Sequence, residues 1–423
     1  MTTGVTITPE IAFSAAAGDV GYLVFDDPTR GKFDTAKFAT TDYFTPIATW
    51  FKRGIVNRGA SRFDGVYGRA EAGTMSIDVA NEDRRFDPTN LGGPYVVAGV
   101  SQVKAGRAVR LRVTHLATGI TYDVFRGFVD EPVLRYRKNW AQTTFRSTDG
   151  TGVVSDYDGV AGGIVGTGED SGARINRVLD NIGWPTEERN VAVGKTTLQG
   201  TDLSANAWSE ICLASDTEIG EVYFDVDGKI VFRNRHGILT DTRSAVSQAT
   251  FGDAGAELGF TNIVLAADLQ QTKNLIRLSR VGGVQQIVSD ATSRTEYRTR
   301  TWGRSDLLNQ TDTEVADYAA YVLSILKDYE VRIDRITIDP LGDPTNLWPQ
   351  VLGRKLGDRV TVKFTPPGGG ARISRDVFIR GITHDMGTST WETTFVFQDA
   401  TKFAALIFDN TVTGLLDTGR FAY

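Results

Sequence analysis

Apolar and polar residues alternate along many short segments of this 423-residue chain. The clearest case is 72–80, where Met75, Ile77 and Val79 alternate with polar or small residues. A two-residue period of this kind predicts a half-buried β-strand. The same period predicts strands over 107–113, 121–129, 140–146, 274–281, 359–364, 376–382 and 391–398. Glycine is abundant (45) and proline is sparse (12), so we expect a mostly β protein with a few helices.

Helical periodicity marks three segments. In 172–183, apolar residues recur at positions i, i+3, i+4 and i+7 starting from Ile175, which predicts a helix with one apolar face. Apolar residues also define one face in 205–215 and in 312–327. Between these helices, 221–235 is predicted to form a hairpin, because Asp227-Gly228 is a pair that type I′ turns prefer.

These elements divide the chain into three expected regions. Residues 1–150 are expected to form a first β domain, either a sandwich or a barrel. Residues 151–260 are expected to form an α+β domain, which begins with a glycine-rich linker over 151–170. Residues 261–423 are expected to form a second β domain that includes the helix over 312–327.

A charged loop follows the strand over 72–80. Pro88 lacks a backbone donor and restricts the residue before it, so the strand cannot simply continue. Phe86 and Tyr95 are expected to anchor the loop. Carboxylates beside two arginines are expected to pair with them, which favours a turn or a contact surface over acid–base chemistry. We therefore expect an interface formed by Glu82, Asp83, Arg84, Arg85, Phe86, Asp87 and Asn90.

Composition excludes several classes of protein. The formal net charge of −6 argues against a general binder of nucleic acid or of anionic membranes. The single cysteine, Cys212, excludes an intrachain disulfide and a cysteine-based zinc site, and we expect it to be buried as a small apolar residue. The first residues lack the pattern of a signal peptide, and no segment has the length of apolar sequence that a membrane span requires.

Motifs for catalysis and cofactors are weak. His115, His236 and His384 have no metal-ligand spacing, and we expect them on the surface or in turns. The glycines of 166–172 and the Gly-Lys-Thr of 194–196 do not have the spacing of phosphate loops. The acidic pattern at 225–228 is better explained by the hairpin than by calcium. We therefore expect no catalytic, metal or cofactor-binding residue and no cofactor.

The order of longer motifs resembles one family nearly end to end. The motifs are AGTMSIDVANEDRRFDPTN with GGPY, KAGRAVRLRV, FRGFVDE, DNIGWP, TEIGEVYFDVDGKIVFRNR, TEVADYAAYVLSIL, LGRKLGDRVTVKF and IRGITHDMGTSTWETTFVF. In this order they resemble the tail-tip (baseplate) hub or minor tail proteins of long non-contractile-tailed bacteriophages of actinobacteria, which are related to the central hubs of contractile phages.

The resemblance implies a fold and a role. It implies two tube-type β-barrel-like domains with smaller α+β domains, and a homotrimer whose duplicated domains match a sixfold tube. It implies a structural virion protein, not an enzyme, at the distal end of the tail and made in the host cytoplasm without a signal peptide. The implied partners are the distal tail protein, the tape-measure protein and tail fibre or receptor-binding proteins. DNA would pass the lumen without specific binding during genome ejection, and no stable membrane insertion is implied.

Three alternatives remain open at this point. A distal tail protein would form a hexameric ring above the hub. A tail-associated glycan-active enzyme would use a carboxylate pair such as Glu82 and Asp87 about 5–9 Å apart. A carbohydrate-binding module would expose tryptophans such as Trp302 or Trp348, whereas core or interface packing is the more usual place for tryptophan.

Overall fold

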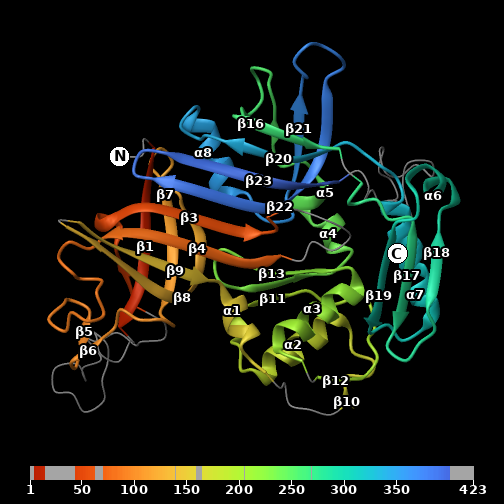
Figure 1. Ribbon diagram of the computed structural model, residues 1–423, viewed down its shortest axis with the longest axis horizontal. Coiled ribbons are helices and arrows are strands. Elements are labelled where there is room, and N and C mark those ends of the chain that lie inside the picture. The colour runs from red at the N-terminus through yellow and green to blue at the C-terminus, as the bar shows by residue number, and fades with distance from the viewer. Residues whose placement is uncertain are drawn as a thin grey trace.

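The computed structural model describes residues 4–14, 43–61, 70–138, 140–158, 164–203, 205–267 and 269–400. Its main feature is a 13-stranded sheet to which both ends of the chain contribute (Figure 1). The first half supplies β1 (Val5–Ser14), β2 (Tyr43–Pro46), β3 (Phe51–Gly59), β4 (Glu71–Ala80), β7 (Ala108–His115), β8 (Thr121–Arg137) and β9 (Trp140–Thr148). The second half supplies β15 (Thr250–Phe251), β16 (Asn262–Ala266), β20 (Arg332–Ile338), β21 (Arg359–Phe364), β22 (Ile373–Gly387) and β23 (Trp391–Asp399). The prediction of a mostly β fold with α+β insertions is confirmed.

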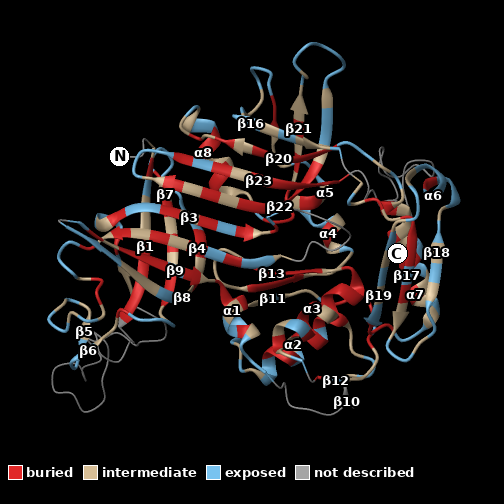
Figure 2. Cartoon of the chain, in the orientation of Figure 1, coloured by how far each residue is buried: buried red, intermediate tan, exposed pale blue. Residues whose placement is uncertain are grey.

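The sheet runs in the order β16-β20-β23-β22-β3-β4-β9-β8-β7-β1-β2. Antiparallel pairing of β22 with β3, from Gly381 opposite Gly59 to Gly387 opposite Arg53, joins the two halves of the chain. Side chains from both halves share one apolar core, which also contains Trp348 of helix α8 (Pro344–Gly353). Figure 2 shows buried and more accessible residues alternating along β3, β4, β22 and β23, as expected for a sheet with one covered face.

Smaller elements lie beside this sheet. One group contains α1 (Gly150–Ser155), α2 (Ser171–Asn181), α3 (Ala207–Glu218), β10 (Ile164–Val165), β11 (Arg189–Val191), β12 (Thr201–Asp202), β13 (Glu221–Phe224), β14 (Ile230–Arg233), α4 (Gly237–Thr240) and α5 (Thr242–Ala245). A second group contains β17 (Leu275–Arg280), β18 (Gln286–Ser289), α6 (Ala291–Tyr297), β19 (Thr301–Leu307) and α7 (Asp312–Leu326), with α7 packed on its sheet. A short hairpin of β5 (Val96–Val97) and β6 (Val100–Ser101) projects from the first half (Figure 1).

Most predicted elements are present with nearly the predicted bounds. β4 buries Met75, Ile77 and Val79, as the alternation predicted. α2 is capped by Asp170, whose side chain accepts a hydrogen bond from the Ala173 amide, and is followed by Gly183 with a positive φ of 68°. In the part of the chain that the structure describes, no helix is long and apolar enough to cross a membrane.

Three local predictions are wrong. The start of the 151–170 linker is helical, because Asp149 caps α1 and Val154 is buried in the core beneath α2 and α3. Residues 159–163 of that linker lie outside the described residues. The 221–235 hairpin does not have a type I′ turn, since Asp227 does not have a positive φ whereas Gly228 does. The Gly228 amide bonds to the Asp225 carbonyl and the Asp225 amide to the Lys229 carbonyl, which is a three-residue loop with a bulge at glycine.

The third wrong prediction concerns the histidines. His115 and His384 are buried, at 2% and 3% exposed, and only His236 lies in an exposed turn. Each buried ring bonds a nearby threonine, Thr118 and Thr393 respectively, at 3.0 Å. Burial lowers the pKa of His384 to about 3, with a further contribution from the Arg58 charge, so this ring stays neutral in the core.

The structure contradicts a carbohydrate-binding role for Trp348. Its side chain is fully buried and packs edge-on against Trp391, with ring centroids 5.0 Å apart. Trp302 is partly buried and packs against the core beneath α7. Helix α8 itself was not predicted, because Pro349 inside it breaks the local signal for a helix.

A Trp348→Ala substitution tests whether α8 is part of the central core. We expect the free energy of unfolding to fall by about 3–5 kcal/mol, because the indole leaves a cavity between the two halves of the sheet. Urea denaturation followed by tryptophan fluorescence and circular dichroism measures the change. Trp140→Ala, at a position 38% exposed, is the matched control and should cost far less. Equal losses in the two variants would contradict this assignment of the core.

Candidate functional site

The charged loop after β4 is held by a buried backbone anchor. The Asn81 side chain is fully buried, accepts a hydrogen bond from the Phe86 amide at 2.9 Å and donates one to Thr143 Oγ1 at 2.9 Å. Phe86 is also fully buried, stacks on Tyr95 at 5.6 Å between centroids, and meets Phe145 edge-on at 5.7 Å. The prediction that Phe86 and Tyr95 anchor the loop is confirmed.

Asp87 is the centre of the loop. Arg84 donates to Asp87 Oδ2 from Nε (2.9 Å) and Nη2 (2.7 Å), and the Tyr136 hydroxyl donates to the same oxygen at 2.8 Å. The amide and hydroxyl of Thr89 donate to Oδ1 at 2.8 and 2.7 Å. Burial opposes ionisation of Asp87, but the hydrogen bonds from Thr89, Arg84 and Tyr136 prevail and hold its pKa well below the usual range.

The neighbouring ion pair has a different environment. Arg85 donates from Nε to Asp83 Oδ2 at 2.6 Å, and its guanidinium carbon lies 3.8 Å from the centroid of the Trp50 ring. The bond from Arg85 lowers the pKa of Asp83. Arg84 has a positive φ of 59°, and the Asn90 side chain donates to its carbonyl oxygen at 3.0 Å, which closes the turn.

These contacts define what the loop can do. The prediction that its carboxylates pair with arginine is confirmed at Asp83 and Asp87. A carboxyl group held ionised in this way is a poor general acid, because acid–base catalysis needs a pKa near the working pH. Glu82 makes no ion pair with the other described residues of the loop, and its side chain is exposed. Leu91, Val97 and Val100, on the loop's continuation and on the β5–β6 hairpin, are exposed apolar residues.

Tyr136 connects the loop to an edge of the main sheet. The hydroxyl group that bonds Asp87 belongs to the last part of β8, so the loop is fixed against that strand. Sequence reasoning missed this contact, since 49 residues separate the two side chains. The long strand over 121–137 was predicted only as far as 129, because Pro132 interrupts the strand pattern.

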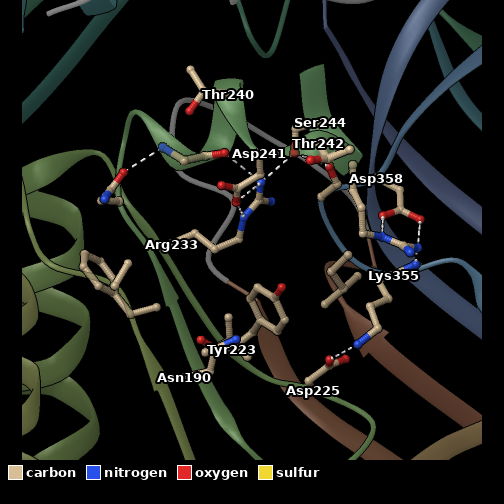
Figure 3. A pocket seen from close by; sticks show the side chains of 18 residues that line it. Asn190, Tyr223, Asp225, Arg233, Thr240, Asp241, Thr242, Ser244, Lys355 and Asp358 are labelled. Atoms are coloured by element: carbon tan, nitrogen blue, oxygen red, sulfur yellow. Dashed lines mark hydrogen bonds and ion pairs between the residues drawn. The ribbon is translucent and has the colours of Figure 1, made fainter. Parts of the chain in front are cut away.

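A polar cleft of about 720 Å³ lies between the α4–α5 region and the turn before β21 (Figure 3). Its cations already hold carboxylates: Arg243 lies 2.5 Å from Asp358, and Lys355 lies 2.6 Å from Asp225. Arg233 donates to Asp241 at 3.2 Å from Nε and to Ser244 Oγ at 2.5 Å. Burial, followed by the charge of Asp225, raises the pKa of Tyr223 at the base of the cleft. The Arg243–Asp358 and Lys355–Asp225 pairs fasten the small elements to the main sheet.

Within the part of the chain that the structure describes, no three histidine, cysteine, aspartate or glutamate side chains are grouped so that they could hold a metal ion. Cys212 is buried, as predicted, on the inward face of α3.

Comparison with known proteins supports the fold. Neither family models nor curated protein sequences match the chain. Among solved structures, the tail protein from Neisseria meningitidis MC58 is similar over 94% of this chain and 97% of its own, with 12% identity and a TM-score of 0.59. The 43 kDa tail protein of prophage MuSo2 from Shewanella oneidensis is similar over 85% and 95%, with 14% identity and a TM-score of 0.52. The chain therefore has the fold of tail proteins along most of its length.

An Asp87→Asn substitution tests the role of the loop's central carboxylate. We expect a loss of about 1.5–3 kcal/mol in the free energy of unfolding at neutral pH, because bonds to an ionised carboxylate become bonds to an amide. The folded-state pKa of Asp87 is depressed, so the stabilisation is present above its unfolded pKa of about 4 and disappears as the pH falls toward the folded value. The difference between the wild type and the variant should therefore be constant from about pH 5 to 7 and shrink below about pH 4.

Denaturation at a series of pH values measures this difference. Asp83→Asn is the control, because the Asp83 side chain is 50% exposed and its pair should contribute less than about 1 kcal/mol. A difference for Asp87→Asn that does not depend on pH would contradict the assignment.

Proposed function

We propose that this chain is a structural virion protein that forms the trimeric hub at the tip of a phage tail, where it continues or closes the DNA channel and anchors neighbouring tail proteins. The similarity to tail proteins over most of the chain carries the proposal. In this role the division into a first β domain (1–150), an α+β domain (151–260) and a second β domain (261–423) would provide two tube-type domains per chain. Three chains would then match a sixfold tube.

The open face of the main sheet fits a channel wall. A row of polar side chains crosses successive strands in register, and none of its members is buried. Hydroxyl and amide groups bond along the row: Thr337 to Thr394 at 3.2 Å, and Thr383 to Asn57 at 3.0 Å. The row consists of Asn262, Thr337, Thr394, Thr383, Asn57, Thr74 and Thr148.

Two arginines on this face already hold carboxylates. Arg53 lies 2.7 Å from Asp385, and Arg146 lies 2.6 Å from Glu131. Asp78, on the neighbouring strand, accepts a hydrogen bond from Thr144 at 2.6 Å. A phosphate backbone is bound chiefly by unpaired cations, so the pairing of Arg53 and Arg146 weakens the attraction of this face for a polyanion. This arrangement favours a wall over a DNA-binding surface.

Removing the paired carboxylates tests this wall. We expect the double variant Asp385→Asn/Glu131→Gln to bind duplex DNA at low salt, because Arg53 and Arg146 are released. The logarithm of its affinity should fall with the logarithm of salt concentration with a slope of about −2, one unit for each freed arginine. Filter binding or fluorescence anisotropy with purified protein measures both quantities.

A matched control removes the same two charges elsewhere. Asp253→Asn/Glu257→Gln frees Arg372, which lies outside this face and bonds both carboxylates. The control should bind DNA no better than the wild type. Equal binding by the two double variants would show that net charge, and not the paired face, controls DNA affinity.

The charged loop after β4 remains a proposed subunit interface. Charge reversal at Arg84 would also break its internal bond to Asp87, so Glu82→Lys is the sharper test. We expect this variant to unfold like the wild type but to enter assembled tails with reduced yield, because the exposed charge would face a neighbouring chain. Thermal denaturation and quantification of the protein in purified tails measure the two properties. Normal incorporation would contradict the interface.

A distal tail protein, which would form a hexameric ring above the hub, is the second candidate. The mass of the purified protein, together with its position in imaged virions, separates the two. A trimer at the tail tip supports the hub, and a hexameric ring above the tip supports the distal tail protein.

A further inference from the structure

The 13-stranded main sheet contains two similar four-strand runs placed end to end. In the first run the order is β16-β20-β23-β22, and in the second it is β3-β4-β9-β8. Each run ends in an unusually long strand, of 15 residues in β22 and 17 in β8. The first part of each long strand also pairs with another strand outside the run, β21 for β22 and β7 for β8.

Irregularities in pairing confirm that the runs are equivalent. Against β23, the register of β22 shifts between Ile379 and Gly381. Against β9, the register of β8 shifts between Val129 and Glu131. In both runs one residue is skipped at the middle of the long strand, so 381–387 of β22 correspond to 131–137 of β8.

Buried positions give the same alignment. Phe395 of β23 lies opposite Ile336 and Ile382. In the second run, Phe145 of β9 lies opposite Ile77 and Pro132. Both phenylalanines are buried in the shared core, at 0% and 1% exposed. These opposed pairs align Pro132 with Ile382, and the register shifts in β22 and β8 give the same alignment.

The two runs differ in what lies beyond their last strand. Residues 381–387 of β22 pair with β3, the first strand of the second run. Among the residues that the structure describes, no strand pairs with the corresponding outer edge of 131–137 in β8, and β16 pairs with β20 alone. These edges lie at the two ends of the eight-strand series, with β16 at the top of Figure 1 and β8 at the lower left.

We infer that β8 of one copy pairs in antiparallel fashion with β16 of a second copy, reproducing between chains the β22–β3 junction found within the chain. An unpaired edge offers a row of backbone donors and acceptors, and a matching edge of the same protein satisfies them. The contact is heterologous, and a heterologous contact builds a ring when its rotation closes and a filament when it does not. This inference rests on the proposed function for the number of copies, but the junction itself rests on the repeated pairing alone.

The equivalence also fixes the register. Asp385 lies opposite Ile55 in the junction within the chain. Pro132 and Ile382 occupy equivalent positions in the two runs, and Arg135 and Asp385 each follow three residues later. Arg135 is therefore the counterpart of Asp385. In the first run, Val264 lies opposite Arg335, and Arg335 lies opposite Val396. In the second run, Ile55 lies opposite Ser76, and Ser76 lies opposite Arg146. Val264 is therefore the counterpart of Ile55. Arg135 of one copy should therefore lie directly opposite Val264 of the next.

Surroundings of the two edges fit this contact. Val264 is 36% exposed and Tyr136, next to Arg135, is 53% exposed, so both strands present apolar surface. Asp87 holds Tyr136 by a 2.8 Å hydrogen bond, which places the charged loop beside the edge of β8. A neighbouring copy on that edge would meet the loop as well.

A pair of cysteines tests the register. Directly opposed residues of an antiparallel pair have Cα atoms about 4.5–5.5 Å apart, within the range that a disulfide spans. We expect the double variant Arg135→Cys/Val264→Cys to form disulfide-linked multimers on mild oxidation, seen on non-reducing gels, with a ladder that ends at three chains. Within one chain the two positions lie on opposite ends of the strand series, so an internal bond is excluded by geometry.

Controls separate this inference from the proposed function. The two single variants should give at most dimers, and Arg135→Cys/Val193→Cys should give no ladder, because Val193 is 70% exposed but lies outside the sheet edges. A protein that is trimeric by mass but whose Arg135→Cys/Val264→Cys variant forms no ladder would overturn the junction and leave the hub standing. A ladder that ends at six chains would support the junction and overturn the trimeric hub.

Discussion

The pairing of β22 with β3 is the contact on which the rest of the structure depends. It joins segments more than 300 residues apart, and the entropy of closing so large a loop must be offset by the sheet and core that the contact completes. Two glycines make the close approach possible. A Cβ on Gly59 would collide with the carbonyl oxygen of Arg380, and one on Gly381 would collide with that of Ala60. Gly59 also has a positive φ of 76°, which other residues rarely adopt.

The same junction fastens the small elements to the sheet. Arg58 and Arg380 directly precede these two glycines, and both side chains are buried. Arg58 lies 3.4 Å from Asp225, and Arg380 donates a hydrogen bond to Glu221. The two arginines therefore bind carboxylates at the two ends of β13. Burial lowers the pKa of both arginines, while the carboxylates oppose that shift. A buried charge without its partner is costly, so the two buried arginines hold β13 in one position once the two halves of the sheet have paired.

Sequence patterns predicted the elements well but not their connections. The alternation in β4 and the apolar face of α7 are local signals, and both are present in the structure. The burial of His384 depends on β3, where Val56 lies opposite it, and the helix around Pro349 packs on a core that both halves of the chain form, so no local pattern reveals them. The charged loop was identified from its residues, whereas its attachment to Tyr136 was not, because that bond exists only after β8 has folded against β9. Duplicated domains were expected only from the family resemblance, because the internal repeat of the sheet is a repeat of pairing and not of residues.

Asp87 illustrates how assembly and catalysis place opposite demands on a carboxylate. A catalytic acid is useful when its proton is loosely held near the working pH, which requires burial without full compensation. Asp87 is buried but receives hydrogen bonds from Arg84, Thr89 and Tyr136, so its charge is fixed and its pKa is low. A fixed charge of this kind gives a loop one conformation. The bond from Tyr136 extends that rigidity to the outer edge of β8, where a preorganised surface would reduce the entropy lost in the proposed contact between copies. The hydrogen bonds that make Asp87 a poor general acid therefore support the proposal that this loop lies at a junction between subunits.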